Sequence, residues 1–177
     1  MKLTWFGGTS VRVHIGGSIL VVDAAVAPAK FDAAELVAGS DQVIADFGAG
    51  LPKADAARWK PAVVPRMLDA GEALPPVEAM AIGDAGVLIA AAGEPPLLLL
   101  KGPPPALGRW VESAVVGVFG DAATLQTVGM ALLAERIPRL VALGGAESAI
   151  DASIPVLRDH LDGAGLVSLE AALAVEI

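Results

Sequence analysis

The sequence contains no cysteine and no tyrosine, and it has only two histidines. Without cysteine, the chain can form neither disulfides nor thiolate metal sites, and it has no cysteine nucleophile. Aromatic residues make up 4% of the chain, and 12 Lys plus Arg stand against 20 Asp plus Glu, which gives a formal net charge of −8 at pH 7. Because nucleic-acid binding depends on clustered basic residues and on stacking aromatics, we expect no nucleic-acid partner.

Apolar residues are abundant, at 55% of the 177 residues, with a mean hydropathy of +0.65. Charged residues nevertheless interrupt every apolar run before the roughly 18 residues that a membrane span requires, so no membrane segment is expected. The stretch after Met1 meets Arg12 early and lacks the continuous apolar segment of a secretory signal, which favours a cytoplasmic location. The length predicts a single domain over residues 1–177.

The apolar excess has two explanations that remain open at this point. Strands buried on both faces of a sheet carry near-continuous apolar sequences, and they account for part of the excess. A surface for self-association would account for the rest, because large exposed apolar patches are rare on monomers. We therefore predict a homodimer.

Short strands are indicated along most of the chain by alternating or continuous apolar runs. Val11, Val13 and Ile15 alternate with polar residues, and Gly16-Gly17 then supplies a tight turn into a second strand at 19–22, which predicts a hairpin. Leu3 to Trp5 can pair with this hairpin as a third strand. The other predicted strands cover 42–45, 62–64, 77–82, 86–90, 97–100, 114–118 and 140–143.

Helical periodicity lies between these strands, at 31–37, 124–135 and 153–161. For the second of these helices, Asp121 is the expected N-cap. We expect the third helix to begin near Ser153, with Pro155 in its first turn, and to end at Gly163. Strands that precede and alternate with helices predict a mixed α/β fold.

The N-terminal residues resemble a known family. Met1–Gly7, Arg12–Ile15, Gly16-Gly17 and Ile19–Asp23 look like the opening of the metallo-β-lactamase superfamily, and most of all its branch of L-ascorbate-6-phosphate lactonases and related small metal-dependent hydrolases. The resemblance implies an α/β fold in the form of a four-layer αββα sandwich, here shortened.

The residues that define the chemistry of that family are missing. Gly8 stands where the family has a histidine, and Phe47–Pro52 occupies the place of its HxHxDH metal motif. The next family histidine falls near Asp84, and the last falls at Gly144-Gly145. The resemblance therefore implies a degenerate member that has lost its metal site, and we expect no metal and no cofactor.

Elementary metal chemistry points the same way. Zinc or manganese needs three or more His, Asp or Glu donors that converge on one point. His14 lies on the polar face of the predicted hairpin and His160 lies near a predicted helix end, and neither has another donor at ligand spacing. Solvated or helix-capping roles fit both histidines better than metal binding.

Two sets of residues remain as weak candidates for a site. Asp23 and Asp84 could meet near the former metal cleft and act as an acid–base pair, although an aspartate at the end of a strand more often caps a turn. Three small-residue loops could bind a small anion or small molecule through backbone N–H groups and hydroxyls; their members are Gly8, Thr9, Ser10, Gly48, Gly50, Gly144 and Gly145. The alternative is that these glycines only form turns, or that Phe47 and Leu51 fill the space.

Two functions follow from these observations. The first is a non-catalytic binding or interaction module that keeps the scaffold without the metals. The second is a metal-dependent or residual hydrolase of a small ester, lactone or phosphate that uses Asp23, Asp84 and a hydroxyl of the Gly8–Ser10 loop. Serine hydrolysis is not expected, because no serine lies in a G-x-S-x-G turn or has an evident base.

Overall fold

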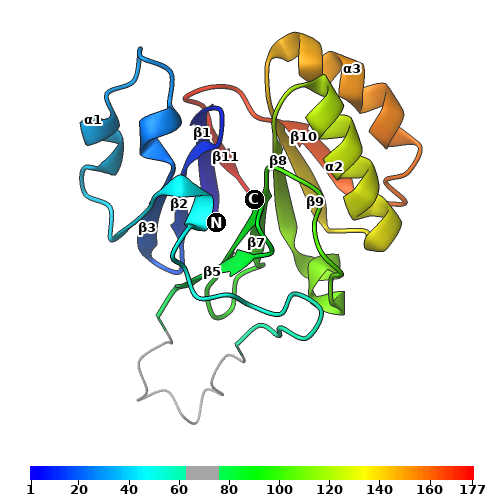
Figure 1. Cartoon of the computed structure of the whole chain (residues 1–177), viewed down its shortest axis with the longest axis horizontal. Coiled ribbons are helices and arrows are strands. Elements are labelled where there is room, and N and C mark those ends of the chain that lie inside the picture. The colour runs from blue at the N-terminus through cyan, green and yellow to red at the C-terminus, as the bar shows by residue number, and fades with distance from the viewer. Residues whose placement is uncertain (63–75) are drawn as a thin grey trace.

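The computed structural model describes residues 1–62 and 76–177 of the chain. In this part, the protein is an α/β structure with two mixed β-sheets, three α-helices and short 3₁₀ turns (Figure 1). The predicted strand at 62–64 falls largely outside the described residues.

The first sheet, sheet A, has five strands in the order β11-β1-β2-β3-β4. They are β1 (Lys2–Gly7), β2 (Ser10–Ile15), β3 (Ser18–Val22), β4 (Gln42–Ile44) and β11 (Ala174–Glu176). All neighbours pair antiparallel except β3 and β4, which are parallel. The predicted hairpin and its third strand are confirmed. Gly16 and Gly17 both have positive φ, as the tight turn between β2 and β3 requires.

The second sheet, sheet B, has six strands in the order β10-β9-β8-β7-β6-β5. They are β5 (Glu78–Ile82), β6 (Gly86–Ala90), β7 (Leu97–Leu100), β8 (Val115–Phe119), β9 (Leu140–Gly144) and β10 (Gly165–Ser168). The strands from β7 to β10 are parallel. Every residue of β6, β7 and β8 is buried, so strands covered on both faces do account for part of the apolar excess.

Three apolar clusters hold these layers together. The cluster between the sheets takes side chains from both, among them Leu3, Val13 and Leu99. On the far face of sheet B, α2 (Ala122–Glu135) and α3 (Glu147–Arg158) cover the strands, as Figure 1 shows. On the far face of sheet A, the short helix α1 (Ala33–Val37) packs Leu36 against Val21 and Ala24. Helices thus lie outside both sheets.

The helix predictions are partly confirmed. Asp121 is the N-cap of α2, and its carboxylate accepts the Thr124 N–H at 2.8 Å. The expected start of α3 near Ser153 is wrong, because the helix begins at Glu147 and ends at Arg158. Pro155 consequently lies inside α3, on its exposed side, and not in the first turn. The N-cap of α3 is Ala146, which makes no side-chain capping bond, so the usual sequence signal for a helix start is missing.

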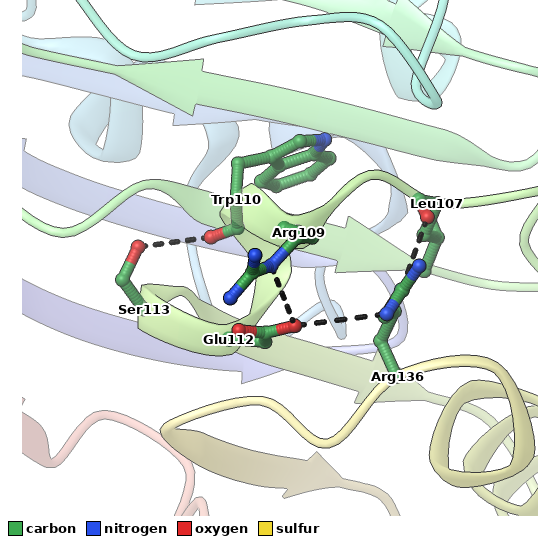
Figure 2. A network of polar contacts seen from close by, with 6 residues as sticks. All are labelled: Leu107, Arg109, Trp110, Glu112, Ser113 and Arg136. Atoms are coloured by element: carbon green, nitrogen blue, oxygen red, sulfur yellow. Dashed lines mark hydrogen bonds and ion pairs between the residues drawn. The ribbon is translucent and has the colours of Figure 1, made fainter.

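A polar network closes one end of sheet B, where β8 begins. The 3₁₀ turn η4 (Arg109–Ser113) places Glu112 Oε1 3.6 Å from both Arg109 Nε and Arg136 Nη1 (Figure 2). Arg136 Nε also donates to the Leu107 carbonyl at 3.4 Å. Trp110, on the same turn, is buried and donates its Nε1–H to the Ala56 carbonyl at 2.7 Å. These contacts tie the C-terminal end of α2 to the loops beneath it.

Within the described residues, no helix has both the length and the apolar character needed to cross a membrane.

Candidate functional site

Asp23 is the centre of the candidate site. It follows the last residue of β3, is 6% exposed, and has both carboxylate oxygens occupied. Oδ2 accepts the Thr9 hydroxyl at 2.5 Å, and Oδ1 accepts the Phe47 N–H at 2.5 Å. The Asp23 N–H in turn donates to the Ile44 carbonyl at 2.8 Å. Asp23 therefore connects the β1–β2 turn to the loop that follows β4.

The backbone around Asp23 is held in an unusual conformation. Asp23, Asp46 and Phe47 have φ values of 50°, 49° and 48°, in the left-handed region. This region is unfavourable for residues with a Cβ, and least so for aspartate and asparagine. For Phe47 the conformation costs on the order of 1 kcal/mol or more, which the hydrogen bond to Asp23 and the burial of the ring offset. Asp23 therefore helps to hold the turn η2 (Asp46–Gly48), together with the backbone bonds of the turn itself.

The glycine loops predicted from the sequence do lie near one another. Trp5 Nε1 donates to the Gly8 carbonyl at 3.0 Å. The same nitrogen would lie 3.1 Å from a Cβ placed on Gly144, and such a Cβ would lie 2.5 Å from Phe119 Cδ1. The loop at Gly144 thus contacts Trp5, which contacts Gly8, while Thr9 contacts Asp23. The structure brings Gly8, Thr9 and Gly144 to the ends of the strands on one side of the two sheets.

Aromatic side chains fill the space between these loops. Trp5, Phe47 and Phe119 are 8%, 4% and 1% exposed, and all three belong to the apolar cluster between the sheets. Leu51 packs against the same cluster. Of the two alternatives left open above, filling by Phe47 and Leu51 fits this arrangement. Gly144 has no room for a side chain, because Phe119 occupies that space.

The second loop, around Gly48, is also built for packing. Gly48 has φ +88°, and a Cβ there would lie 2.9 Å from Val87 Cγ2. Its N–H donates to the Ala45 carbonyl at 3.0 Å, so this donor is already used within the turn. Such a turn uses glycine for its conformation. The Gly48 N–H is not available to an anion.

Asp84 is placed apart from Asp23. It is exposed in the turn between β5 and β6 and lines a small cavity of about 210 Å³ together with Gly48, Gly50 and Lys53. Asp23 instead lines a different cavity. Among the described residues, no hydrogen bond joins the Asp23 and Asp84 carboxylates. Asp23 instead accepts hydrogen bonds from the Thr9 hydroxyl and the Phe47 N–H.

The cavity beside Asp23 has a volume of about 610 Å³ and lies between the 3₁₀ turn η1 (Ala24–Val26), α1 and β4. Alanine and valine form most of its wall, including Val26 and Val43, which are 52% and 53% exposed. Lys101 lies at this cavity, with its Nζ 4.9 Å from the centre of the Phe47 ring. A cation over an aromatic face is a favourable contact, and it places a positive charge at the cavity that Asp23 lines.

The remaining candidates have other surroundings. Ser10 is fully buried, and among the described residues its hydroxyl has no hydrogen-bond partner. A hydroxyl without exposed surface is not accessible to a substrate from solution. Gly145 lies on a further cavity of about 490 Å³, beside Trp5 and the first turns of α3.

Neither histidine contributes a metal site in the part of the chain that the structure describes. His14 lies across from Lys2 on sheet A, and burial together with the charges of Arg12 and Lys2 lowers its pKa below 6.5. His160 follows the end of α3. Over residues 1–62 and 76–177, no three His, Cys, Asp or Glu side chains converge as metal ligands would.

Sequence reasoning missed the residues that shape this site. Trp5 and Phe119 are ordinary apolar strand residues in the sequence, and only the pairing of distant strands makes them neighbours of Gly8 and Gly144. Lys101, just after β7, carries no motif. The one available signal was the large aromatic Phe47 between small residues, where a tight turn with a buried ring could have been expected.

No protein-family model matches the sequence, and a search of curated proteins finds no match. The function is therefore inferred from the geometry of the site.

Proposed function

We propose that this protein is a non-catalytic binding or interaction module built on a shortened metallo-β-lactamase-like αββα scaffold. The N-terminal resemblance and the placement of helices outside two facing sheets support the scaffold. The central observation is that Asp23 has both oxygens engaged by Thr9 and Phe47. Asp23 connects two loops, and buried aromatic side chains fill the space between the glycine loops. The cavity of about 610 Å³ that Asp23 also lines has a wall formed mostly by alanine and valine.

The chemistry of the superfamily explains why this arrangement disfavours catalysis. A metal-dependent hydrolase uses a metal-bound hydroxide as nucleophile and the metal ion to polarise the scissile bond. Here Gly8, Phe47 and Gly144 stand in the places where the resemblance puts ligands. Phe47 and the Phe119 ring beside Gly144 are buried between the sheets. A metal ion at this position would have to displace part of the core, at the cost of several kcal/mol for each aromatic removed.

The competing hydrolase hypothesis needs Asp23 as a base or a ligand. A base must have a free lone pair directed at the substrate proton, within hydrogen-bonding distance. Each Asp23 oxygen already accepts one hydrogen bond, from Thr9 or from Phe47, and the residue is only 6% exposed, so little of the carboxylate is accessible to a substrate. Asp84 lines another cavity. The structure offers no observation that favours this second function over the first.

Hydrolysis assays separate the two functions. Lactone, phosphodiester and β-lactam probes are incubated with the protein, with and without added Zn²⁺ or Mn²⁺, alongside the Asp23→Asn variant. We expect no turnover above the buffer control for either protein. Turnover by the wild type that falls at least about tenfold in a folded Asp23→Asn variant would identify Asp23 as a catalytic residue, and the binding-module proposal would be withdrawn.

A further inference from the structure

The four sheet edges differ in how they are protected from pairing with another chain. An unpaired edge strand is a template for a further strand, and proteins usually protect it by shortness, charge, proline or a covering segment. Each sheet has two edges, formed by β4 and β11 in sheet A and by β5 and β10 in sheet B. Three of these edges have one of the usual protections.

The edge at β5 carries Glu78 and is covered, because Ala81 exchanges hydrogen bonds with Pro52 and Ala54. The edges at β4 and β11 are three residues long, and β11 carries Glu176. The remaining edge, β10, has the sequence Gly165-Leu166-Val167-Ser168, without charge or proline. On the described residues, β10 pairs with β9 alone.

The free edge of β10 has a definite hydrogen-bonding pattern. Gly165 N donates to the Arg139 carbonyl at 3.0 Å, and Leu169 N donates to the Leu143 carbonyl at 2.8 Å, so alternate residues face β9. In a parallel ladder, the residues between them direct their N–H and C=O groups away from that neighbour. Leu166 and Ser168 therefore present their backbone donors and acceptors at the edge.

We propose that two copies of this chain pair antiparallel through β10, about a two-fold axis at Val167. In this register, Leu166 of one copy lies opposite Ser168 of the other, and each such pair exchanges two N–H···O=C bonds. The axis generates the same pair twice, as an isologous interface requires. The two six-stranded sheets then form one continuous sheet across the dimer. The pairing goes beyond the proposed function and holds whether or not the site is catalytic.

Charges beside the edge fit this register. Extending it by two residues places Ala164 opposite Glu170 of the other copy. On the inner side, the β9–β10 register places Arg139 beside Ala164. Leu140 and Leu169 both pack toward the core between the sheets. Arg139 precedes β9 by one residue and Glu170 follows β10 by two, and a continued strand alternation would direct both side chains to the opposite, helix-covered face.

Arg139 and Glu170 can therefore meet across the small side chain of Ala164. Both are exposed, and among the described residues neither forms an ion pair within its own chain. Two strand spacings separate them, about 10 Å between backbones, which an arginine and a glutamate can span together. The axis again gives two such contacts. This complementarity favours a second copy over an unrelated strand as the partner.

Light scattering after size-exclusion chromatography tests the pairing. We expect wild-type protein at about 50 µM to have twice the chain mass of 17.8 kDa. Ser168→Pro removes an N–H that points away from β9, so it weakens the dimer without breaking the β9–β10 ladder. Ser168→Thr keeps this N–H and is the matched control. We expect a monomer for the proline variant, a dimer for the threonine variant, and unchanged far-UV circular dichroism for both.

A charge reversal tests the register itself. Arg139→Glu and Glu170→Lys should each raise the dimer dissociation constant about tenfold, because each turns two attractive contacts into repulsive ones. The double variant should restore it to within about threefold of wild type. A wild-type monomer at every concentration, a dimer unaffected by Ser168→Pro, or a double variant no better than the single ones would each overturn the proposal.

Discussion

The Asp23 contacts lead to a quantitative prediction about stability. Asp23→Ala removes the acceptor of two hydrogen bonds and leaves the Phe47 N–H and the Thr9 hydroxyl without their partner. Hydrogen bonds to a charged group contribute about 1.5–3 kcal/mol each, and alanine is less suited than aspartate to φ 50°. We expect the free energy of unfolding to fall by about 3–5 kcal/mol, a large part of the 5–15 kcal/mol typical of a domain.

Asp23→Asn separates the charge from the geometry. Asparagine tolerates the left-handed conformation, its carbonyl can accept from Phe47, and its amide can donate to the Thr9 oxygen. Since neutral hydrogen bonds are about half as strong as charge-assisted ones, we expect a loss of about 1–2 kcal/mol. Thr9→Val removes one of the two bonds and should cost a similar amount, and Asp84→Asn, at an exposed turn, is the control.

Urea unfolding followed by circular dichroism measures these differences. With a slope near 2 kcal/mol per M, the Asp23→Ala midpoint should fall by about 1.5–2.5 M, with the slope unchanged. Asp84→Asn should shift it by less than about 0.3 M. If Asp23→Ala changes the free energy of unfolding by less than about 0.5 kcal/mol, Asp23 does not hold the two loops together, and its buried carboxylate must be explained by binding or catalysis instead.

Three further predictions concern single side chains. Gly144→Ala places a Cβ 2.5 Å from the Phe119 ring and should cost about 1–3 kcal/mol in the same unfolding assay. Burial and neighbouring cations lower the pKa of His14, so its contribution to stability is complete above pH 6.5 and decreases as the pH falls. His14→Gln should therefore reduce the pH dependence of the melting temperature below pH 6.5. Bonds from Thr124 lower the pKa of Asp121, so the melting-temperature difference between wild type and Asp121→Ala should shrink as the pH falls below 3.8.

Local patterns were sufficient for part of the fold. The alternation at 10–15 and the Gly16-Gly17 turn determine a hairpin through local chemistry alone, and Asp121 is an N-cap for the same reason. Helix α3 was predicted six residues too late, because Ala146 offers no capping side chain and Pro155 resembles a helix start. The sequence patterns do not predict β10 and β11, because these strands have only four and three residues and show no clear alternation. The Asp162-Gly163 turn, in which both residues have positive φ, precedes β10, but the sequence pattern assigns Gly163 only to the end of the third helix.

The site depended on contacts that no local pattern contains. The sequence draws attention to Asp23 and to the glycine loops, since these follow strand ends. It could not show that the Asp23 carboxylate binds Thr9 and Phe47, because residues 14 and 24 positions away meet it only after sheet A forms. The filling of the space by Trp5 and Phe119 likewise depends on how the two sheets pack.

The metal content of the protein tests the central claim most directly. Purified protein is incubated with excess Zn²⁺ or Mn²⁺, passed through a desalting column with a mild chelator, and analysed for metal per chain. We expect less than about 0.1 equivalent of either metal, because Phe47 and Phe119 are buried in the core between the sheets and Asp23 accepts hydrogen bonds from Thr9 and Phe47. One equivalent or more retained per chain, and lost in Asp23→Ala, would show that the site binds metal and would contradict the account.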